Sequence, residues 1–308
     1  MFQPDMIELT DLRHFAHVAR AGSFSGGARL SHVTPPAVSK AVQKLEGELG
    51  VRLFERTTRR VALTEAGHEL LTRCTRIFGE LEELRSVLDE RATRVAGEVR
   101  VAAMEVFSLE LLPRALAELV RTYPDVVPLV CERGPRDIEQ LVLDGRADVG
   151  FTIGGGGRPG LDYEELGRST PVLVCGASHP LHGAARIRRQ HLEEHPFVVP
   201  RLLGREGDPA LDQFPEVAGP RRVGATIELL QMGVQLCIEG AFLGYFPEVS
   251  IRAPLADGRL HRLKGVRGAT PFILSALTRG GTMHRPAVAE IIGEVRRHVR
   301  RAIGTSPS

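Results

Sequence analysis

The sequence predicts an α/β protein with a small helical N-terminal domain, one long helix and a larger C-terminal region in which strands and helices alternate. Apolar residues recur at helical spacing through residues 9–49, and a proline-free helical pattern runs from 65 to 91. Short apolar runs separated by helical segments fill residues 97–303, as in sheets covered by helices. The chain of 308 residues is long enough for two or three domains with separate cores.

Two helices are expected before residue 32. The first carries an apolar stripe and ends at Gly22, because glycine adopts the left-handed conformation that closes a helix. Ser23 is placed to cap the second helix with its hydroxyl. The second helix contains Gly26 and Gly27, which lower its intrinsic stability. The stripe of the first helix consists of Leu9, Leu12, Phe15 and Val18.

A third helix, expected over residues 34–50, has one apolar and one polar face. Thr34 is placed to cap it, and Pro35 and Pro36 fall in the first turn, where a missing N–H costs little. The apolar face is Val38, Val42, Leu45 and Leu49, and the polar face is Pro36, Ala37, Ser39, Lys40 and Gln43. Small and polar side chains in this pattern suit base edges and phosphates in a DNA groove. An ordinary amphipathic helix with a solvated polar face is the alternative.

Two short extended runs follow, residues 51–56 and 60–64, and they predict a hairpin with a basic tip. Such a wing can reach a phosphate backbone. The residues expected to contact DNA are Ser23, Thr34, Pro35, Pro36, Ala37, Ser39, Lys40, Gln43, Arg56, Thr57, Arg59 and Arg60.

Residues 7–67 resemble the winged helix-turn-helix of LysR-type transcriptional regulators. The resemblance is carried by Phe15, Gly22-Ser23-Phe24, Ala28, Pro36-Ala37-Val38-Ser39-Lys40, Leu45-Glu46, Leu49-Gly50, Leu53-Phe54-Glu55-Arg56 and Leu63-Thr64-Glu65-Ala66-Gly67. It departs from the family at Pro35, where glutamine is common, and at Ser31, where leucine is common. The resemblance implies a bacterial regulator that binds double-stranded DNA.

Composition and charge fit this expectation. The net charge of +2 is small, but residues 1–64 hold nine Lys or Arg against six Asp or Glu, so the basic excess lies in the proposed DNA-binding part. No apolar run is long enough to span a membrane and no signal peptide is recognisable, so we expect a cytoplasmic protein associated with the nucleoid. The widely spaced cysteines, Cys74, Cys131, Cys175 and Cys237, suggest neither a zinc site nor a redox pair.

The long helix carries an apolar seam with alternating spacings of four and three residues, a period of about 3.5 residues that is typical of a coiled coil. The seam consists of Leu70, Cys74, Ile77, Leu81, Leu84 and Leu88. We expect it to join two chains, with packing on its own domain as the alternative. In the resembled family this helix forms an antiparallel dimer, which implies a homodimer or homotetramer on an interrupted palindromic promoter site.

Residues 97–303 contain two successive sets of strands and helices and loosely resemble the effector-binding half of the same family, a two-lobed fold like that of periplasmic binding proteins. The resemblance is carried by Leu111-Leu112-Pro113, Tyr123-Pro124, Leu143-Asp144-Gly145, Asp148, His179-Pro180-Leu181, Gly240 and Pro247. The expected domains are residues 1–67 for DNA binding, 65–94 for the linker helix and hinge, and 95–308 for effector binding. Lobe I is expected over about 97–170 and 268–303, and lobe II over about 171–267.

A small-molecule effector is expected in the crevice between the lobes, beyond the C-terminal ends of the strands. The expected lining is Met104, Glu105, Val106, Thr152, Ile153, Pro200, Arg201 and Thr226. Many relatives have Ser or Thr after the first strand, at a helix N-terminus that suits a carboxylate. Glu105 would repel a carboxylate, while Arg201 would attract one. We therefore expect a less acidic effector or an occluded crevice. A solvent-facing Glu105 is the alternative.

No catalytic, cofactor or metal site is expected. His191 and His195 fit the H-x-x-E-H zinc pattern, but Pro196 ends the helix that would have to carry both ligands. Two alternative functions stay open: an enzyme with an attached DNA-binding domain, and a ligand sensor that has lost specific DNA readout through Pro35 and Ser31. If the regulator is an activator, contact with RNA polymerase follows.

Overall fold

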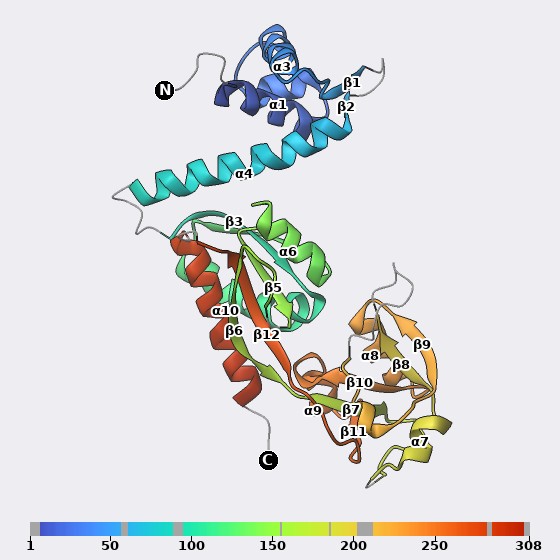
Figure 1. The fold of residues 1–308 in the computed structure, drawn as a ribbon. Helices are drawn as coiled ribbons and strands as arrows, with labels where there is room; N and C mark the ends of the chain where they lie inside the picture. The colour runs from blue at the N-terminus through green and yellow to red at the C-terminus, as the bar shows by residue number, and fades with distance from the viewer. Residues whose placement is uncertain are drawn as a thin grey trace. The chain divides into compact units, whose positions relative to one another are not determined.

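The structure is a computed structural model that describes residues 7–56, 61–88, 95–154, 156–184, 186–201, 212–281 and 285–304, without the side chains of residues 56 and 82–88. The chain forms two compact units (Figure 1): Met1–Ala92 with Asp144–Arg146, and Thr93–Leu143 with Ala147–Ser308. None of the helices in the described part of the chain combines the length and the apolar character that a bilayer span requires.

The N-terminal unit contains three short helices, a two-stranded hairpin and one long helix. These elements are α1 (Leu9–Ala21), α2 (Phe24–Leu30), α3 (Pro35–Leu49), β1 (Phe54–Arg56), β2 (Val61–Leu63) and α4 (Glu65–Leu88). α1 and α3 end at Gly22 and Gly50, with φ angles of 62° and 69°, so both predicted helix ends are confirmed. The core between the helices is built around Phe15 and Leu45, both fully buried.

Gly27 in α2 permits the close approach of α2 to α1. A Cβ atom at this position would lie 2.5 Å from Val18 Cγ2 and 2.7 Å from Val18 Cα. The side chain of Val18 is itself fully buried in the same core. The glycine therefore lowers the helical propensity of α2 but is required by its packing.

The first half of α4 belongs to the core of the N-terminal unit. Cys74 is completely buried in one chain, and its Sγ lies 3.9 Å from the carbonyl oxygen of Leu12 in α1. Leu70 and Ile77 are half-buried against the same cluster. The prediction that Cys74 lies in a seam between two chains was therefore wrong, because intrachain packing uses the same helical face. Leu81 is half-buried, and the side chains of Leu84 and Leu88 lie outside the described residues.

Lobe I of the C-terminal unit is a five-stranded sheet with the order β4-β3-β5-β12-β6. Its strands are β3 (Gly97–Ala103), β4 (Val126–Glu132), β5 (Val149–Ile153), β6 (Leu161–Ser169) and β12 (Phe272–Arg279). Its helices are η1 (Phe107–Leu111), α5 (Leu112–Thr122), α6 (Pro135–Leu143) and α10 (Pro286–Gly304). Along β3, Val101 faces the core shared with α5 and α10, whereas Ala102 faces the core under α6, so helices cover both faces of the sheet.

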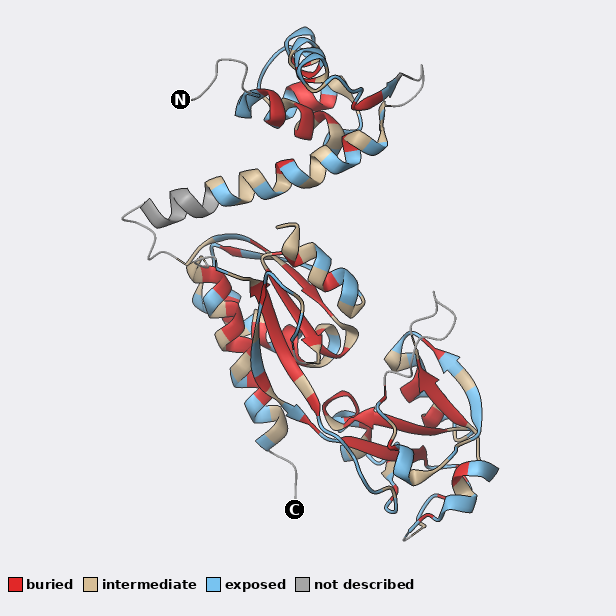
Figure 2. Cartoon of the chain, in the orientation of Figure 1, coloured by how far each residue is buried: buried red, intermediate tan, exposed pale blue. Residues whose placement is uncertain are grey.

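Lobe II repeats this arrangement with a second five-stranded sheet, β11-β7-β10-β8-β9. Its strands are β7 (Pro171–Gly176), β8 (Phe197–Pro200), β9 (Val223–Ile227), β10 (Leu243–Pro247) and β11 (Leu260–Arg262). Its helical segments are α7 (Arg189–Glu194), η2 (Glu216–Ala218), α8 (Leu230–Ile238), η3 (Glu248–Ser250) and α9 (Arg252–Ala256). Figure 2 shows that buried residues line the strands of both sheets.

The expected α/β class is confirmed, but neither sheet is purely parallel. β12 pairs antiparallel with β5 and β6, and β7 pairs antiparallel with β10 and β11. β6 and β7 follow one another along the chain in different sheets, and β12 returns the chain to the first sheet. The antiparallel strands are therefore those next to the connections between lobes. The sequence analysis did not identify β6, whose charged and apolar residues do not alternate regularly.

Replacement of Gly27 with alanine tests the packing of α1 on α2. We expect Gly27→Ala to lower the free energy of unfolding by about 1–3 kcal/mol, because the new methyl group meets the α1 backbone. Gly47→Ala in α3 is the matched control, since no atom lies within 4 Å of its Cβ position. The control should stabilise the unit by about 0.5–1 kcal/mol. Chemical denaturation measures both changes, and equal effects of the two variants would contradict the packing role of Gly27.

His179 makes the stability of lobe II depend on pH. Its ring is buried, its Nδ1 accepts the N–H of Leu181 at 3.1 Å, and burial together with the neighbouring His195 lowers its pKa from 6.5 to about 4. The unfolded chain binds this proton more readily, so stability is lost as the pH falls from 6.5 towards 4. His179→Asn keeps an acceptor for Leu181 but cannot be protonated. Thermal unfolding across this range should depend less on pH in the variant, and unchanged pH dependence would contradict the assignment.

Candidate DNA-binding surface and inter-lobe crevice

The outward face of α3 is exposed along its whole length. Pro36, Ala37, Lys40 and Gln43 are exposed, and Ser39 is half-buried. Val38 and Leu45, on the opposite face, are completely buried in the core of the unit. Burial of one stripe therefore fixes the orientation of the helix and presents the other face to solvent.

The caps of α2 and α3 differ from each other. Ser23 Oγ accepts the backbone N–H of Gly26 at 3.1 Å, as expected. Thr34 is the N-cap of α3, but its hydroxyl makes no cap bond, so this detail of the prediction was wrong. The prolines at the first two positions carry no N–H, and the N–H of Ala37 donates to the Thr34 carbonyl at 3.0 Å instead.

Two lysines of α3 have different environments. Lys44 Nζ lies 2.7 Å from Glu8 Oε1 and 3.0 Å from Asp11 Oδ2, so it ties α3 to α1. The hydrogen bond to Glu8 raises the pKa of Lys44 above its usual value. Lys40 is exposed and has no ion-pair partner among the described residues. Lys40 is therefore the cation of α3 that can bind an external phosphate or base.

Glu46 connects α3 to the hairpin, a role that the sequence analysis did not assign. Its Oε1 accepts the N–H of Leu53 at 2.7 Å and that of Phe54 at 3.3 Å. The hairpin itself pairs Phe54 with Leu63 and Arg56 with Val61. The predicted tip residues Thr57, Arg59 and Arg60 and the side chain of Arg56 lie outside the described residues.

Ser31, where the sequence departs from the resembled family, has a polar partner. Its hydroxyl lies 2.9 Å from His17 Nδ1 on α1. Leu30, beside it, is exposed. A hydrogen bond therefore connects α1 to the end of α2.

In the C-terminal unit, the end of β3 and the end of β5 meet at the predicted crevice. Met104 Sδ lies 3.3 Å from Thr152 Oγ1 and 3.3 Å from the N–H of Ile153, so all three predicted residues are together. Val106 is buried in the core of lobe I. Pro200, Arg201 and Thr226 lie on the other sheet, where Pro200 is buried and Thr226 is exposed.

Glu105 is half-buried, and both of its carboxylate oxygens have partners. Its Oε2 accepts the N–H of Leu230 at 2.5 Å and its Oε1 accepts that of Gln231 at 2.9 Å, both in the first turn of α8 in lobe II. These two hydrogen bonds speak against the alternative of a solvent-facing Glu105. Glu110 also contacts lobe II, because its Oε1 lies 3.3 Å from Gln231 Nε2.

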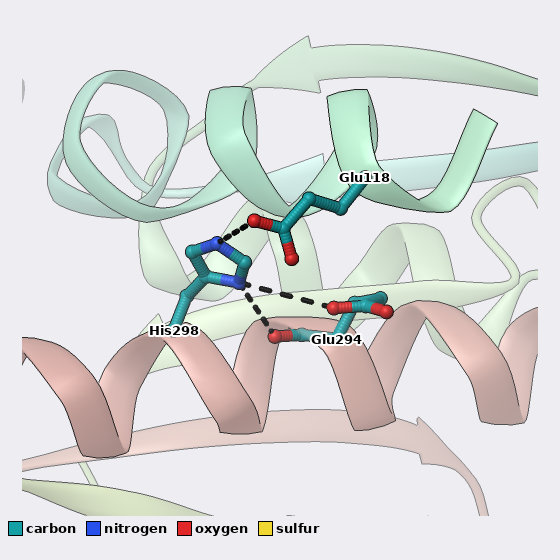
Figure 3. Close-up of side chains that lie close together, drawn as sticks. All are labelled: Glu118, Glu294 and His298. Atoms are coloured by element: carbon teal, nitrogen blue, oxygen red, sulfur yellow. Dashed lines mark hydrogen bonds and ion pairs between the residues drawn. The ribbon is translucent and has the colours of Figure 1, made fainter. Parts of the chain in front are cut away.

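A cluster of metal-ligand type in the described residues joins α5 to α10 (Figure 3). Glu118, Glu294 and His298 present atoms within 4.8 Å of one another. His298 Nδ1 lies 3.0 Å from the Glu294 carbonyl oxygen, Arg297 pairs with Glu294, and Arg301 lies 3.7 Å from Glu118. These contacts form an ion-pair network between α5 and α10. The side chains of Glu118, Glu294 and His298 therefore already have partners within the chain.

The H-x-x-E-H sequence does not form a zinc site of the peptidase type. α7 ends at Glu194, and His195 has an extended backbone with φ of −99° and ψ of 134°. His191 Nδ1 accepts the N–H of Arg188 at 3.1 Å, while the His195 ring packs on His179. The two histidines therefore do not share one face of a helix, as the position of Pro196 predicted.

Comparisons with known proteins match both parts of the chain. Residues 9–68 match the bacterial regulatory helix-turn-helix protein, lysR family, and residues 92–300 match the LysR substrate binding domain. The HTH-type regulator YbhD of Escherichia coli is 26% identical over 285 residues, which cover 87% of each chain.

Two solved structures share the fold. A full-length OxyR variant from Pseudomonas aeruginosa has a TM-score of 0.75 at 20% identity, over 94% of this chain and 95% of that one. CbnR in complex with its target DNA has a TM-score of 0.64 at 23% identity, over 94% and 99%. The match of the substrate-binding family covers more than half of the chain and follows that of the helix-turn-helix family after an interval of residues 69–91. The chain therefore belongs to the LysR family of transcriptional regulators.

Proposed function

We propose that this regulator acts as a homodimer or homotetramer that binds an interrupted palindromic promoter site through α3 and the wing, and that a small molecule in the inter-lobe crevice modulates it. The observation that carries the proposal is the outward face of α3, where Ala37, Lys40 and Gln43 are exposed in one row. Their methyl, ammonium and amide groups can contact thymine, guanine or phosphate, and adenine.

The wing is proposed to extend the same surface. Glu46 ties the start of the hairpin to α3, so the wing and the recognition helix are held together. The basic residues proposed for the phosphate contacts of the tip are Arg56, Arg59 and Arg60, next to Thr57. Thr34 and Pro35 are proposed to lie against the backbone of DNA at the N-terminus of α3.

The C-terminal half of α4 is the proposed dimer contact. Cys74 packs within its own chain, so the seam that remains for a second chain begins near Leu81 and continues through Leu84 and Leu88. Apolar residues at coiled-coil spacing in this half have a period of about 3.5. A dimer supplies two recognition helices for two half-sites.

We further propose that the chain is not an enzyme and acts on DNA in the bacterial cytoplasm, in contact with RNA polymerase if it is an activator. The relatives with curated names are transcriptional regulators, and CbnR is a solved neighbour bound to its target DNA. The alternative function, a ligand sensor without specific DNA readout, depends on Ser31 and Pro35. The bond between Ser31 and His17 favours an intact helix-turn-helix.

Selection from random duplex DNA tests the proposed function. The purified full-length protein should enrich an interrupted palindrome at near-physiological salt, because two heads related by symmetry read two half-sites. Sequencing of the enriched pool measures this. Binding that depends on salt but not on sequence would contradict specific readout and support the alternative of a ligand sensor.

Lys40→Ala and Lys44→Ala separate DNA contact from intrachain pairing on one helix. Lys40→Ala should reduce the slope of log affinity against log salt concentration by about 0.9 if it removes one phosphate contact, or relax preference at one guanine if it removes a base contact. Lys44→Ala should leave the slope unchanged, because Lys44 pairs with Glu8 and Asp11. Fluorescence anisotropy at several salt concentrations measures the slopes. An equal effect of both substitutions would contradict the assignment.

A further inference from the structure

The donors at the end of β5, where an effector is expected, are occupied by the chain itself. Thr152 Oγ1 and the N–H of Ile153 both approach Met104 Sδ, each at 3.3 Å. Met104 also packs against the apolar clusters on both faces of the lobe I sheet. The polar groups at the end of β5 therefore point at a side chain of this chain and not into an open crevice.

In lobe II, the first turn of α8 presents backbone N–H groups. Its N-cap is Leu229, whose side chain cannot accept a hydrogen bond, so the first N–H groups have no local cap. A carboxylate there gains from the free donors and from the helix dipole. Glu105 supplies this carboxylate from lobe I, with one oxygen on Leu230 N–H and the other on Gln231 N–H.

Two further carboxyl groups, those of Glu110 and Glu132, are related to this contact. Glu132 stands close enough for Glu105 to contribute, together with burial, to a raised pKa of the Glu132 carboxyl. Glu110 accepts a hydrogen bond from the side-chain amide of Gln231. Burial raises the pKa of Glu110 as well. Two carboxyl groups of lobe I thus contact the first turn of α8, and among the described residues it is Glu105 that accepts from its backbone N–H groups.

We infer that Glu105 is an internal ligand of the crevice, which bridges the two lobes and excludes a carboxylate-bearing effector from the first turn of α8. Glu105 occupies the position that an effector's anionic group would take. The crevice then admits ligands that are uncharged or cationic and leave this bridge intact. The inference depends on the proposed function only in naming the crevice as the effector site.

Backbone hydrogen exchange of the full-length protein tests this bridge directly. In Glu105→Ala, fragments that contain residues 230 and 231 should exchange roughly tenfold faster or more than in the wild type, since each amide loses a charged acceptor. Sodium acetate should slow this exchange again in the variant, because its carboxylate can replace that of Glu105. Sodium chloride at equal ionic strength and the neutral mimic acetamide should not.

Two further variants act as controls. Glu105→Gln keeps the volume of the side chain and one neutral oxygen acceptor, so it should speed the exchange by less than Glu105→Ala does and show less rescue by acetate. Glu132→Gln removes a negative charge nearby but no acceptor of α8, so residues 230 and 231 should exchange as in the wild type. Unchanged exchange in fragments from the buried strand β12 verifies that each variant is folded.

Three outcomes would overturn the inference: slow exchange at residues 230 and 231 in both Glu105 variants, faster exchange that acetate does not reverse, or protection of residues 104–106 by acetate in the wild type. DNA selection by the wild-type protein is measured separately. Its failure would contradict the proposed function but leave the exchange results, and hence the bridge, unaffected.

Discussion

Burial of a single apolar stripe on α3 determines what the N-terminal unit can do. Val38 and Leu45 are completely buried against α1, and this contact leaves one orientation for the helix. At about 25 cal/mol per Å² of apolar surface, rotation of this stripe into water would cost several kcal/mol, comparable with the stability of a small domain. Burial of this stripe thus determines that the row from Ala37 to Gln43 faces solvent.

The two units use carboxylates as structural acceptors in the same way. Glu46 holds two N–H groups at the start of the hairpin, and Glu105 holds two at the start of α8. Glu46 joins two consecutive elements, whereas Glu105 joins elements that are distant in the sequence. A charged acceptor binds an N–H group more strongly than a neutral one. The position of the wing and the separation of the lobes therefore both depend on a glutamate.

The helices of the N-terminal unit were predictable because their end glycines, their apolar stripes and the Ser23 cap are local signals. Gly22 and Gly50 mark the ends at which α1 and α3 stop. The long-range contacts were not predictable, because no local pattern shows that Cys74 meets α1 or that Glu105 reaches α8. Repulsion of carboxylates was inferred from the charge of Glu105 alone. Its partners in the other lobe, and the thioether contact of Met104, required the folded chain.

The shared core of α4 and the DNA-binding helices has a mechanical consequence. Because Cys74 and Leu70 are packed among residues of α1, the first half of α4 cannot turn without α1, and α3 is packed on α1 in turn. Helices α1 to α3 and the first half of α4 therefore move as one rigid body. In the proposed dimer, a small change of angle where two α4 helices meet would change the spacing of the two α3 helices along the DNA.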